Sequence, residues 1–456
     1  MGIMARAIGA KPNASSRPAW ITAYVAIAVT VAGDTMFSGD SFRPTMAWGV
    51  WSSLAVASVL ACLWFLRNKV AVIRRMPIEL NLFLGLLAAS TFWSAYWVNT
   101  LIGLTTCLQA VIVALFLAAN FDWRELLKIF ANVIRVVLIA SFAVEIYAAS
   151  VAKGSLGSLF NSNGQSAVLS QGNLFSGQRI QGILANSNLL AAIALIGVIV
   201  FAIEFFAKNA FAWQSISSLV LSVAAIVLSK SAGIVFASVA VLLAAVVSLF
   251  AEGKNYETRH RIYRITWVVT GVVMFFVLSF RREVFDILGK SPDMTHRTFI
   301  WKRVFSLFQQ RPFEGWGFTG VWQPGVHPFE NLIVINGQGY FQAHNAYLDI
   351  LLQVGLVGFV LFAVVLVRTF VRLWRLAVHH SSSLYLWPLL VLVAELVRAI
   401  TESRLIIESA FMILVLFAVK ATEPDDTLEA RTGQIKLEQL QEFGRTPITK
   451  ARIAKR

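Results

Sequence analysis

Long apolar segments separated by shorter polar connections recur along the whole chain. A membrane-spanning helix needs ~20 predominantly apolar residues, and in lipid only helices and closed barrels pair all their backbone polar groups. The pattern therefore predicts an all-α polytopic membrane protein with about 12 transmembrane helices. The candidate spans are 20–36, 45–66, 78–96, 101–119, 126–149, 186–206, 213–228, 232–250, 265–280, 346–367, 384–399 and 405–419.

Two polar connections are much longer than the others. Residues 150–185 are rich in Ser, Gly, Asn and Gln, which predicts a flexible loop. Residues 281–345 contain a stretch whose apolar positions recur at helical spacing, namely Ile300, Val304, Leu307 and Phe308. We therefore expect an amphipathic helix over 296–310, lying on the outer membrane surface and stopped by Pro312.

The composition supports this class. Hydrophobic residues make up 57% of the chain and charged residues 14%, and the mean hydropathy is +0.70. A chain with this composition is too apolar to be a soluble domain. The formal net charge of +15 follows the distribution of Lys and Arg around the spans, so we predict contact with anionic lipid headgroups and no nucleic-acid partner.

Lys and Arg are concentrated in alternate connections, which the positive-inside tendency assigns to the cytoplasm. Arg17 precedes the first span as it would in a signal sequence, but the many later spans favour an uncleaved anchor. The predicted organisation is a cytoplasmic N-terminus at 1–19, nine spans in 20–280 with an outer polar loop at 150–185, a large periplasmic loop at 281–345, three spans in 346–420 and a charged cytoplasmic tail at 421–456.

The cysteines and the motif content predict no cofactor. Cys62 and Cys107 both lie in predicted spans and are expected to be packing residues. The sequence has no Cys/His pairing with zinc spacing, no phosphate-binding or dinucleotide glycine pattern and no Asp-x-Asp pair. We therefore predict neither a metal nor a nucleotide-sugar donor bound through one.

Several basic residues are predicted to meet at the outer lipid–water boundary. They are Arg179, Lys230, Arg297, Arg311 and His344. Cationic side chains at this level suit a ligand with an anionic head and a lipid tail, because guanidinium groups bind phosphate oxygens in pairs. The alternative is that arginines near span ends extend to lipid headgroups without binding a substrate.

Charged residues within other spans have simpler interpretations. Arg135 and Glu145 lie too far apart on one helix to pair, so each needs a partner elsewhere. Asp349 either orients the outer site or pairs with a nearby arginine. The last helical hairpin has helical spacing between Glu395 and Arg398, Arg398 and Glu402, and Arg404 and Glu408. This spacing predicts structural ion pairs, with acceptor binding as the alternative.

Two motifs carry a family resemblance. HRTFIWKRVFSLFQQRPFEGWGF at 296–318 and HNAYLDILLQVGLVGFVLF at 344–362 occur together after a large outer loop. Weaker matches are TFWSAYWVNTL at 91–101, RIQGILANSNLL at 179–190 and LSKSAGIVFASVAVLL at 228–243. With these motifs the chain resembles the O-antigen ligase and polymerase family of bacterial inner-membrane glycosyltransferases, which join glycans carried on polyprenyl diphosphate.

The resemblance implies roles for individual residues. His344 falls on the loop-end histidine of the family and is the implied general base, followed by Asn345. Arg297 falls on the arginine of a Gly-Arg-Thr pattern, although His296 replaces the glycine. Lys230 stands where the family usually has arginine. The remaining implied residues are Arg179 and Asn188, with Arg311 and Asp349 added from their predicted location.

The implied activity is transfer of a polyprenyl-diphosphate-linked glycan to a hydroxyl acceptor, at the periplasmic face of the inner membrane and without a cofactor. The implied partners are the lipid-linked donor, a glycan or lipid A core acceptor, membrane lipids and other polysaccharide assembly proteins. Growth of a polysaccharide is slightly favoured over ligation to lipid A core, because no acceptor-specific motif is present. A transporter or flippase with twelve spans is the alternative from another class.

Overall fold

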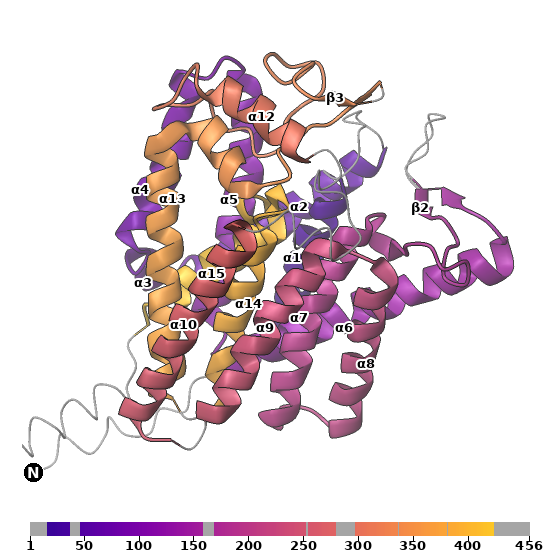
Figure 1. Ribbon diagram of the computed structural model, residues 1–456, viewed down its shortest axis with the longest axis vertical. Helices are drawn as coiled ribbons and strands as arrows, with labels where there is room; N and C mark the ends of the chain where they lie inside the picture. Colours follow the sequence, from indigo (N-terminus) through magenta and orange to yellow (C-terminus); the bar gives the residue numbers. More distant parts are fainter. Residues whose placement is uncertain are drawn as a thin grey trace, which may run out of the picture.

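Helices make up most of the computed structural model, which describes residues 16–36, 46–157, 168–251, 254–279, 297–335, 337–380 and 382–423. The helices are α1 (Arg17–Met36), α2 (Met46–Leu66), α3 (Val70–Arg74), α4 (Ile78–Ala89), α5 (Trp97–Asn120), α6 (Trp123–Tyr147), α7 (Ser187–Phe206), α8 (Ala212–Ser229), α9 (Ala232–Ala251), α10 (Tyr256–Ser279), α12 (Arg297–Phe308), α13 (Ala346–His379), α14 (Trp387–Arg398) and α15 (Glu408–Lys420). Figure 1 shows α12 at one end of the helical bundle.

Each apolar segment identified in the sequence contains one of these helices, which confirms the all-α membrane class. Within the described residues, however, only six helices are long and apolar enough to cross a membrane. These six spans are Gly49–Leu66, Trp97–Asn120, Trp123–Ala152, Ser187–Phe206, Ala212–Ser229 and Ala346–His379. The count of twelve spans therefore stays a proposal. The N-terminal residues 1–15, the middle of the 150–185 loop, residues 280–296 and the tail from 424 lie outside the described residues.

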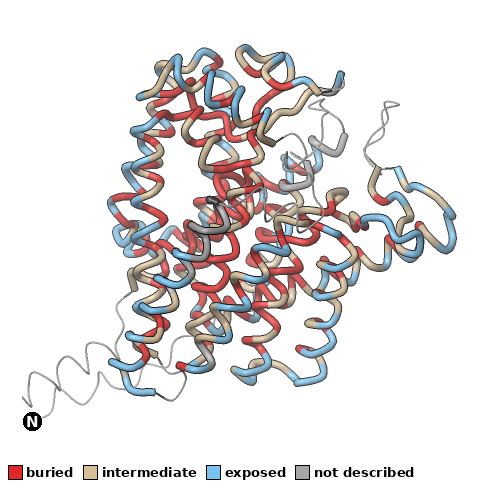
Figure 2. Tube along the Cα trace, in the orientation of Figure 1, coloured by how far each residue is buried: buried red, intermediate tan, exposed pale blue. Residues whose placement is uncertain are grey.

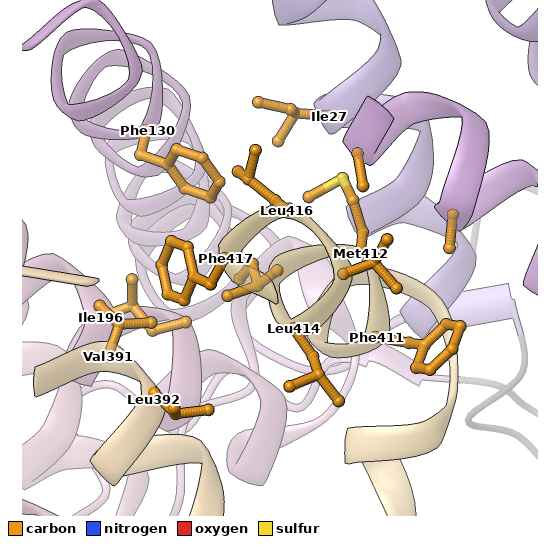
Figure 3. Close-up of a cluster of buried hydrophobic side chains, with 14 of the residues drawn as sticks. Ile27, Phe130, Ile196, Val391, Leu392, Phe411, Met412, Leu414, Leu416 and Phe417 are labelled. Carbon is orange, nitrogen blue, oxygen red and sulfur yellow. The ribbon is translucent and has the colours of Figure 1, made fainter. Parts of the chain in front are cut away.

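The core of the bundle surrounds α15. Every residue from 410 to 420 is buried, as expected for a helix that is apolar on all sides. Figure 2 shows the buried residues concentrated inside the bundle, and Figure 3 shows Leu416 and Phe417 of α15 among side chains of several other helices. With 13 residues, α15 is ~20 Å long at 1.5 Å per residue, which is shorter than a bilayer core. It is thus a central helix enclosed by protein.

Helix α13 is interrupted where the sequence suggested a continuous span. Val354 and Gly355 have non-helical dihedral angles, and the φ of Gly355 is +66°. The chain after α12 fills the break, because the amide of Leu356 donates to the carbonyl of Pro312 (2.8 Å) and the amide of Gly317 donates to that of Gln353 (2.8 Å). A Cβ at position 355 would overlap the backbone of the inserted chain. The interruption therefore requires glycine and leaves its polar backbone paired within protein.

The inserted chain is fixed by Gln353, which is fully buried. Its Oε1 accepts from the amides of Thr319 (2.8 Å) and Gly320 (2.9 Å), and its Nε2 donates to the carbonyl of Gly320 (3.1 Å). The glycine-rich turn at 315–320 therefore directs these amides into the fold. This arrangement couples the end of α12 to the middle of α13.

The amphipathic helix predicted over 296–310 is present as α12, and its apolar face is covered by protein; its expected location at the outer membrane surface stays a prediction. Ile300, Val304 and Leu307 are buried in a second hydrophobic cluster that includes Trp322 and Phe329. The apolar face packs against protein because the aromatic chain that follows α12 folds back over it. Helix α12 is thereby packed against α13.

The polar loop at 150–185 contains some regular structure. A helical turn η3 (Ala148–Ala152) ends α6, β1 (Leu156–Gly157) pairs with β2 (Val168–Ser170), and η4 (Gly182–Leu184) precedes α7. The carboxylate of Glu145 accepts hydrogen bonds from the amides of Gln181 (2.9 Å) and Gly182 (2.8 Å). This buried carboxylate therefore fixes the approach of the chain to α7. A second hairpin, β3 (Val334–Ile335) with β4 (Gln338–Gly339), lies between α12 and α13.

Arg135 of α6 also has partners on other helices. Arg135 forms an ion pair with Glu204 of α7 at 2.8 Å and donates to Ser218 of α8 at 2.8 Å. The prediction that Arg135 and Glu145 need partners elsewhere is confirmed. Both interactions are structural, and neither involves the outer basic residues.

Candidate active site

A single carboxylate joins residues from three distant parts of the sequence. Glu402 lies in the connection between α14 and α15, and its Oε1 is 3.4 Å from Nη2 of Arg297 and accepts from Nδ2 of Asn188 at 2.9 Å. Its Oε2 is 3.6 Å from Nδ1 of His344. Three of the residues predicted from the sequence therefore meet, around a fourth that was not assigned to the site.

His344 is positioned by residues on both sides of it. The next residue, Asn345, caps α13, because its side chain accepts from the amides of Tyr347 (3.0 Å) and Leu348 (3.1 Å). The amide of Asn345 donates to Oγ of Ser403 at 3.1 Å, which holds it beside Glu402. His344 itself has a φ of +49°, a region that non-glycine residues rarely adopt. Since Asn345 supplies the cap, α13 does not need the imidazole to begin.

Ala343, just before His344, is held by two further side chains. The indole of Trp301 on α12 donates to the carbonyl of Ala343 at 3.1 Å, and Oδ2 of Asp349 accepts from its amide at 3.2 Å. Asp349 is almost fully buried at 1% exposure. Of the two sequence interpretations, the structure favours a role of Asp349 in orienting the chain at His344.

Arg179 reaches the cluster through Asn188, at the start of α7. Arg179 donates from Nη2 to Oδ1 of Asn188 at 2.7 Å and from Nε to the carbonyl of Ser229 at 2.9 Å. Ser231 also donates to Oδ1 of Asn188, at 2.9 Å. Between these serines lies Lys230, which ends α8 with a φ of +50° and donates from Nζ to the carbonyl of Gly177. Arg179 therefore borders the cluster, one step beyond Glu402, whereas the amino group of Lys230 contacts the loop at Gly177.

Arg311 does not join this group. Helix α12 has 12 residues and is ~18 Å long, and Arg311 follows its far end while Arg297 begins it. The guanidinium of Arg311 lies 4.4 Å from the ring centroid of Trp316, and its Nη1 is 3.4 Å from the carbonyl of Trp93. The structure thus gives Arg311 a packing environment of its own.

The cluster is only partly accessible. The side-chain exposures are 16% for Arg297, 20% for His344 and 12% for Glu402. Burial acts to raise the pKa of Glu402, but the neighbouring His344, Arg297 and Arg404 outweigh it and hold this pKa below its ordinary value. Glu402 is therefore ionised at neutral pH. Burial lowers the pKa of Arg179, although a guanidinium stays protonated.

Glu402 was recognisable in the sequence as a paired carboxylate, but the partner predicted for it, Arg398, is wrong. Two of the three pairs predicted in the last hairpin are formed: Arg398 pairs with Glu395, and Arg404 pairs with Glu408 at 3.0 Å. The carboxylate of Glu402 is used instead by the cluster described above. Arg398 does not pair with Glu402 because its guanidinium contacts Glu395, and Glu402 has extended dihedral angles after α14 has ended at Arg398. The residue pattern did not indicate that α14 ends at Arg398. This end allows the side chain of Glu402 to face the starts of α12 and α13.

Comparison with known proteins agrees with the resemblance found in the sequence. Residues 217–363 match the family model described as O-Antigen ligase. This range contains Lys230, Arg297 and His344, whereas Arg179, Asn188 and Glu402 lie outside it. The resemblance to the O-antigen ligase family is therefore confirmed for the part of the chain that begins in α8 and ends in α13.

Two curated relatives match shorter stretches. The chain is 28% identical over 90 residues to "Exopolysaccharide production protein ExoQ" of Rhizobium meliloti (strain 1021), a match that covers 19% of this chain and 21% of the relative. It is 31% identical over 103 residues to "Putative polysaccharide ligase" of Rickettsia felis (strain ATCC VR-1525 / URRWXCal2), covering 21% of this chain and 25% of the relative. The matches thus span about a fifth to a quarter of these relatives' lengths.

Proposed function

We propose that this chain is a membrane glycosyltransferase that transfers a glycan from a polyprenyl diphosphate to a hydroxyl acceptor. The observation that carries the proposal is the convergence of His344, Arg297 and Asn188 on Glu402. The cluster joins a histidine to a guanidinium, with the further cation Arg179 at its border. The distribution of Lys and Arg along the chain supports a location at the periplasmic face of the inner membrane.

The basic residues would hold the donor. A glycosyl diphosphate already carries a good leaving group, so the protein must position it and stabilise the charge that grows on the departing diphosphate. Arg297 is suited to this task because its guanidinium can bind two phosphate oxygens at once. Arg179 is joined to the same cluster through Asn188 and would help to bind the diphosphate. Lys230 lies between Ser229, which contacts Arg179, and Ser231, which contacts Asn188, and would approach the diphosphate from the end of α8. This arrangement supplies cationic stabilisation from the chain itself, without a metal.

His344 would accept the proton of the incoming hydroxyl. Its Nδ1 faces Glu402 at 3.6 Å, longer than a hydrogen bond, and a closer approach in the loaded enzyme would favour the tautomer with a proton on Nδ1. Nε2 would then be free to act as the base. The bond between the anomeric carbon and the diphosphate breaks, the acceptor oxygen bonds to that carbon, and its proton passes to His344.

The acceptor separates two versions of the proposal. Polysaccharide growth is slightly favoured because the sequence contains no acceptor-specific motif, and one relative is named for exopolysaccharide production. Ligation to lipid A core is the alternative, and another relative is named a polysaccharide ligase. A transporter is disfavoured, because the interruption of α13 has polar groups paired with the chain at 312–320 and does not leave them for a substrate.

The direct test is turnover by the purified protein in detergent, with a lipid-linked glycan as the sole donor. We expect release of polyprenyl diphosphate together with longer lipid-linked glycans. Transfer to added lipid A core without chain growth would assign ligation instead. A transporter needs two compartments, so complete absence of turnover with either acceptor, in protein that still binds the donor, would contradict the proposal.

Glu402→Gln tests whether this carboxylate positions the catalytic groups. The amide keeps the shape and the contact with Asn188 but loses the charge facing Arg297 and His344. We expect turnover to fall ~10-fold or more, as for a lost charged hydrogen bond. The wild-type rate should fall at acid pH where Glu402 becomes protonated, and this limb should be missing from the variant, because its amide carries no charge at any pH.

The matched control is Glu395→Gln, in the same hairpin but paired with Arg398. This change should lower stability and leave the shape of the pH–rate profile unaltered. If Glu402→Gln instead behaves like the control in both measurements, Glu402 has only a structural role.

A further inference from the structure

A cavity of about 420 Å³ lies between α7, α8 and α9 and extends to α10, α14 and the end of α13. Figure 1 shows α8 and α9 on either side of α7. The inner wall consists of buried aliphatic side chains such as Leu195, Ile199 and Val241, whereas Val223 and Leu242 on α8 and α9 are about half exposed or more. This volume is within the ~300–1,000 Å³ range of small-ligand sites. An apolar groove open on the lipid-facing side of the bundle suits a hydrocarbon chain.

One end of the cavity contains a buried cation. Arg259 of α10 lines it and is only 7% exposed. Its Nη1 donates to the carbonyl of His380 at 3.2 Å, but its buried Nε has no hydrogen-bond partner. Among the residues that the structure describes, no carboxylate is paired with Arg259. Burial of a guanidinium without an anion is costly, so this end of the cavity favours an anionic ligand.

This end is remote from the candidate active site. Helix α9 begins just after Ser231, which contacts Asn188, and ends at Ala251 beside the cavity. Its 20 residues correspond to ~30 Å, and α7, one of the six helices able to cross a membrane, runs over the same length from Ser187 to Phe206 at the cavity. A ligand whose anionic head lies at Arg259 therefore belongs to the opposite membrane surface from the glycan donor.

We propose that the cavity binds an anionic phospholipid, with its phosphate at Arg259 and an acyl chain along the groove between α8 and α9. The guanidinium of Arg259, which has no carboxylate partner among the described residues, matches the phosphate of such a lipid, and the apolar groove matches its acyl chain. Basic pockets between membrane helices are typical sites for anionic headgroups. Tyr263 and Ser383 also line this end and add hydroxyl groups near the phosphate. The site is independent of the proposed transferase activity.

The test uses the full chain in detergent, titrated with phosphatidylglycerol or phosphatidylcholine of identical acyl chains. Mass spectrometry of the intact complexes measures the affinity of each lipid. We expect phosphatidylglycerol to bind at least ~10-fold more tightly, as for a charged hydrogen bond. Arg259→Gln should abolish this preference, whereas Arg261→Gln, an exposed arginine on the same helix, should keep it.

A second variant tests the groove with the cation in place. Ala245→Phe should fill part of the cavity and weaken phosphatidylglycerol binding although Arg259 is unchanged. Equal binding of the two phospholipids by the wild type would overturn the proposal, as would an Arg259→Gln variant that keeps the preference. Tighter binding of a polyprenyl phosphate than of phosphatidylglycerol, equal in wild type and Arg259→Gln, would assign the cavity to the carrier lipid and equally overturn it.

Discussion

His344→Gln is expected to abolish glycan transfer while the protein remains folded and inserted. Glutamine keeps hydrogen-bonding capacity but cannot accept a proton at neutral pH, and a lost general base costs ~10²- to 10⁴-fold in rate. The fold should tolerate the change because Asn345, not His344, caps α13. Donor binding should also persist, since it is assigned to the basic residues. The measurement is turnover of lipid-linked donor by purified protein, beside donor affinity.

Asn345→Ala is the contrasting control. Loss of the cap should cost ~1 kcal/mol of stability, which thermal unfolding would detect. The two variants thus separate loss of chemistry from loss of helix capping. A His344→Gln enzyme that retains more than about a tenth of the wild-type turnover would reduce His344 to a positioning role, because the minimum expected loss is ~10²-fold.

Arg297→Ala is expected to produce the second largest loss, ~10- to 150-fold in turnover, from a missing charged hydrogen bond to the diphosphate. The guanidinium of Arg297 lies 3.4 Å from Glu402, the carboxylate that also faces His344. Arg297→Lys should recover only part of the loss, because an ammonium cannot bind two oxygens in a fork. The assay is the dependence of the rate on donor concentration, with the membrane-inserted amount measured in parallel.

Arg311→Ala provides the matched control, because Arg311 lies just beyond the other end of α12. Arg311 lies over Trp316 at the other end of α12, so its removal should reduce stability more than donor use. Similar kinetic losses in the two arginine variants would contradict the separation of their roles. Near-normal glycan production by Arg297→Ala would exclude this residue from the site.

The helices could be predicted because their signal is local. Apolar length and periodicity placed a helix in each predicted span, and the spacing of Ile300, Val304 and Leu307 gave α12 nearly to the residue. Asn345 was recognisable as a helix cap from its place before an apolar run. Each of these features depends on residues within a few positions of one another, so the sequence alone contains the information.

Part of the candidate site was also accessible from the sequence. His344, Arg297 and Asn188 were selected from motifs and from their shared side of the predicted topology, and the structure brings them to one carboxylate. Arg311 satisfied the same criterion but lies at the other end of α12. Topology assigns a residue to a surface and gives no position within it, so it could not distinguish the two arginines.

The tertiary structure alone decided the partner of Glu402, the burial of α12 and the interruption of α13. Each depends on chain segments far apart in sequence: Glu402 meets Arg297 across 105 positions, and the break at Gly355 is stabilised by the carbonyl of Pro312 through Leu356. A buried polar group must find a partner, but the pattern around it does not specify which distant one. The sequence by itself thus determined the helices and nominated candidate site residues, whereas packing between helices determined which of those candidates lie together.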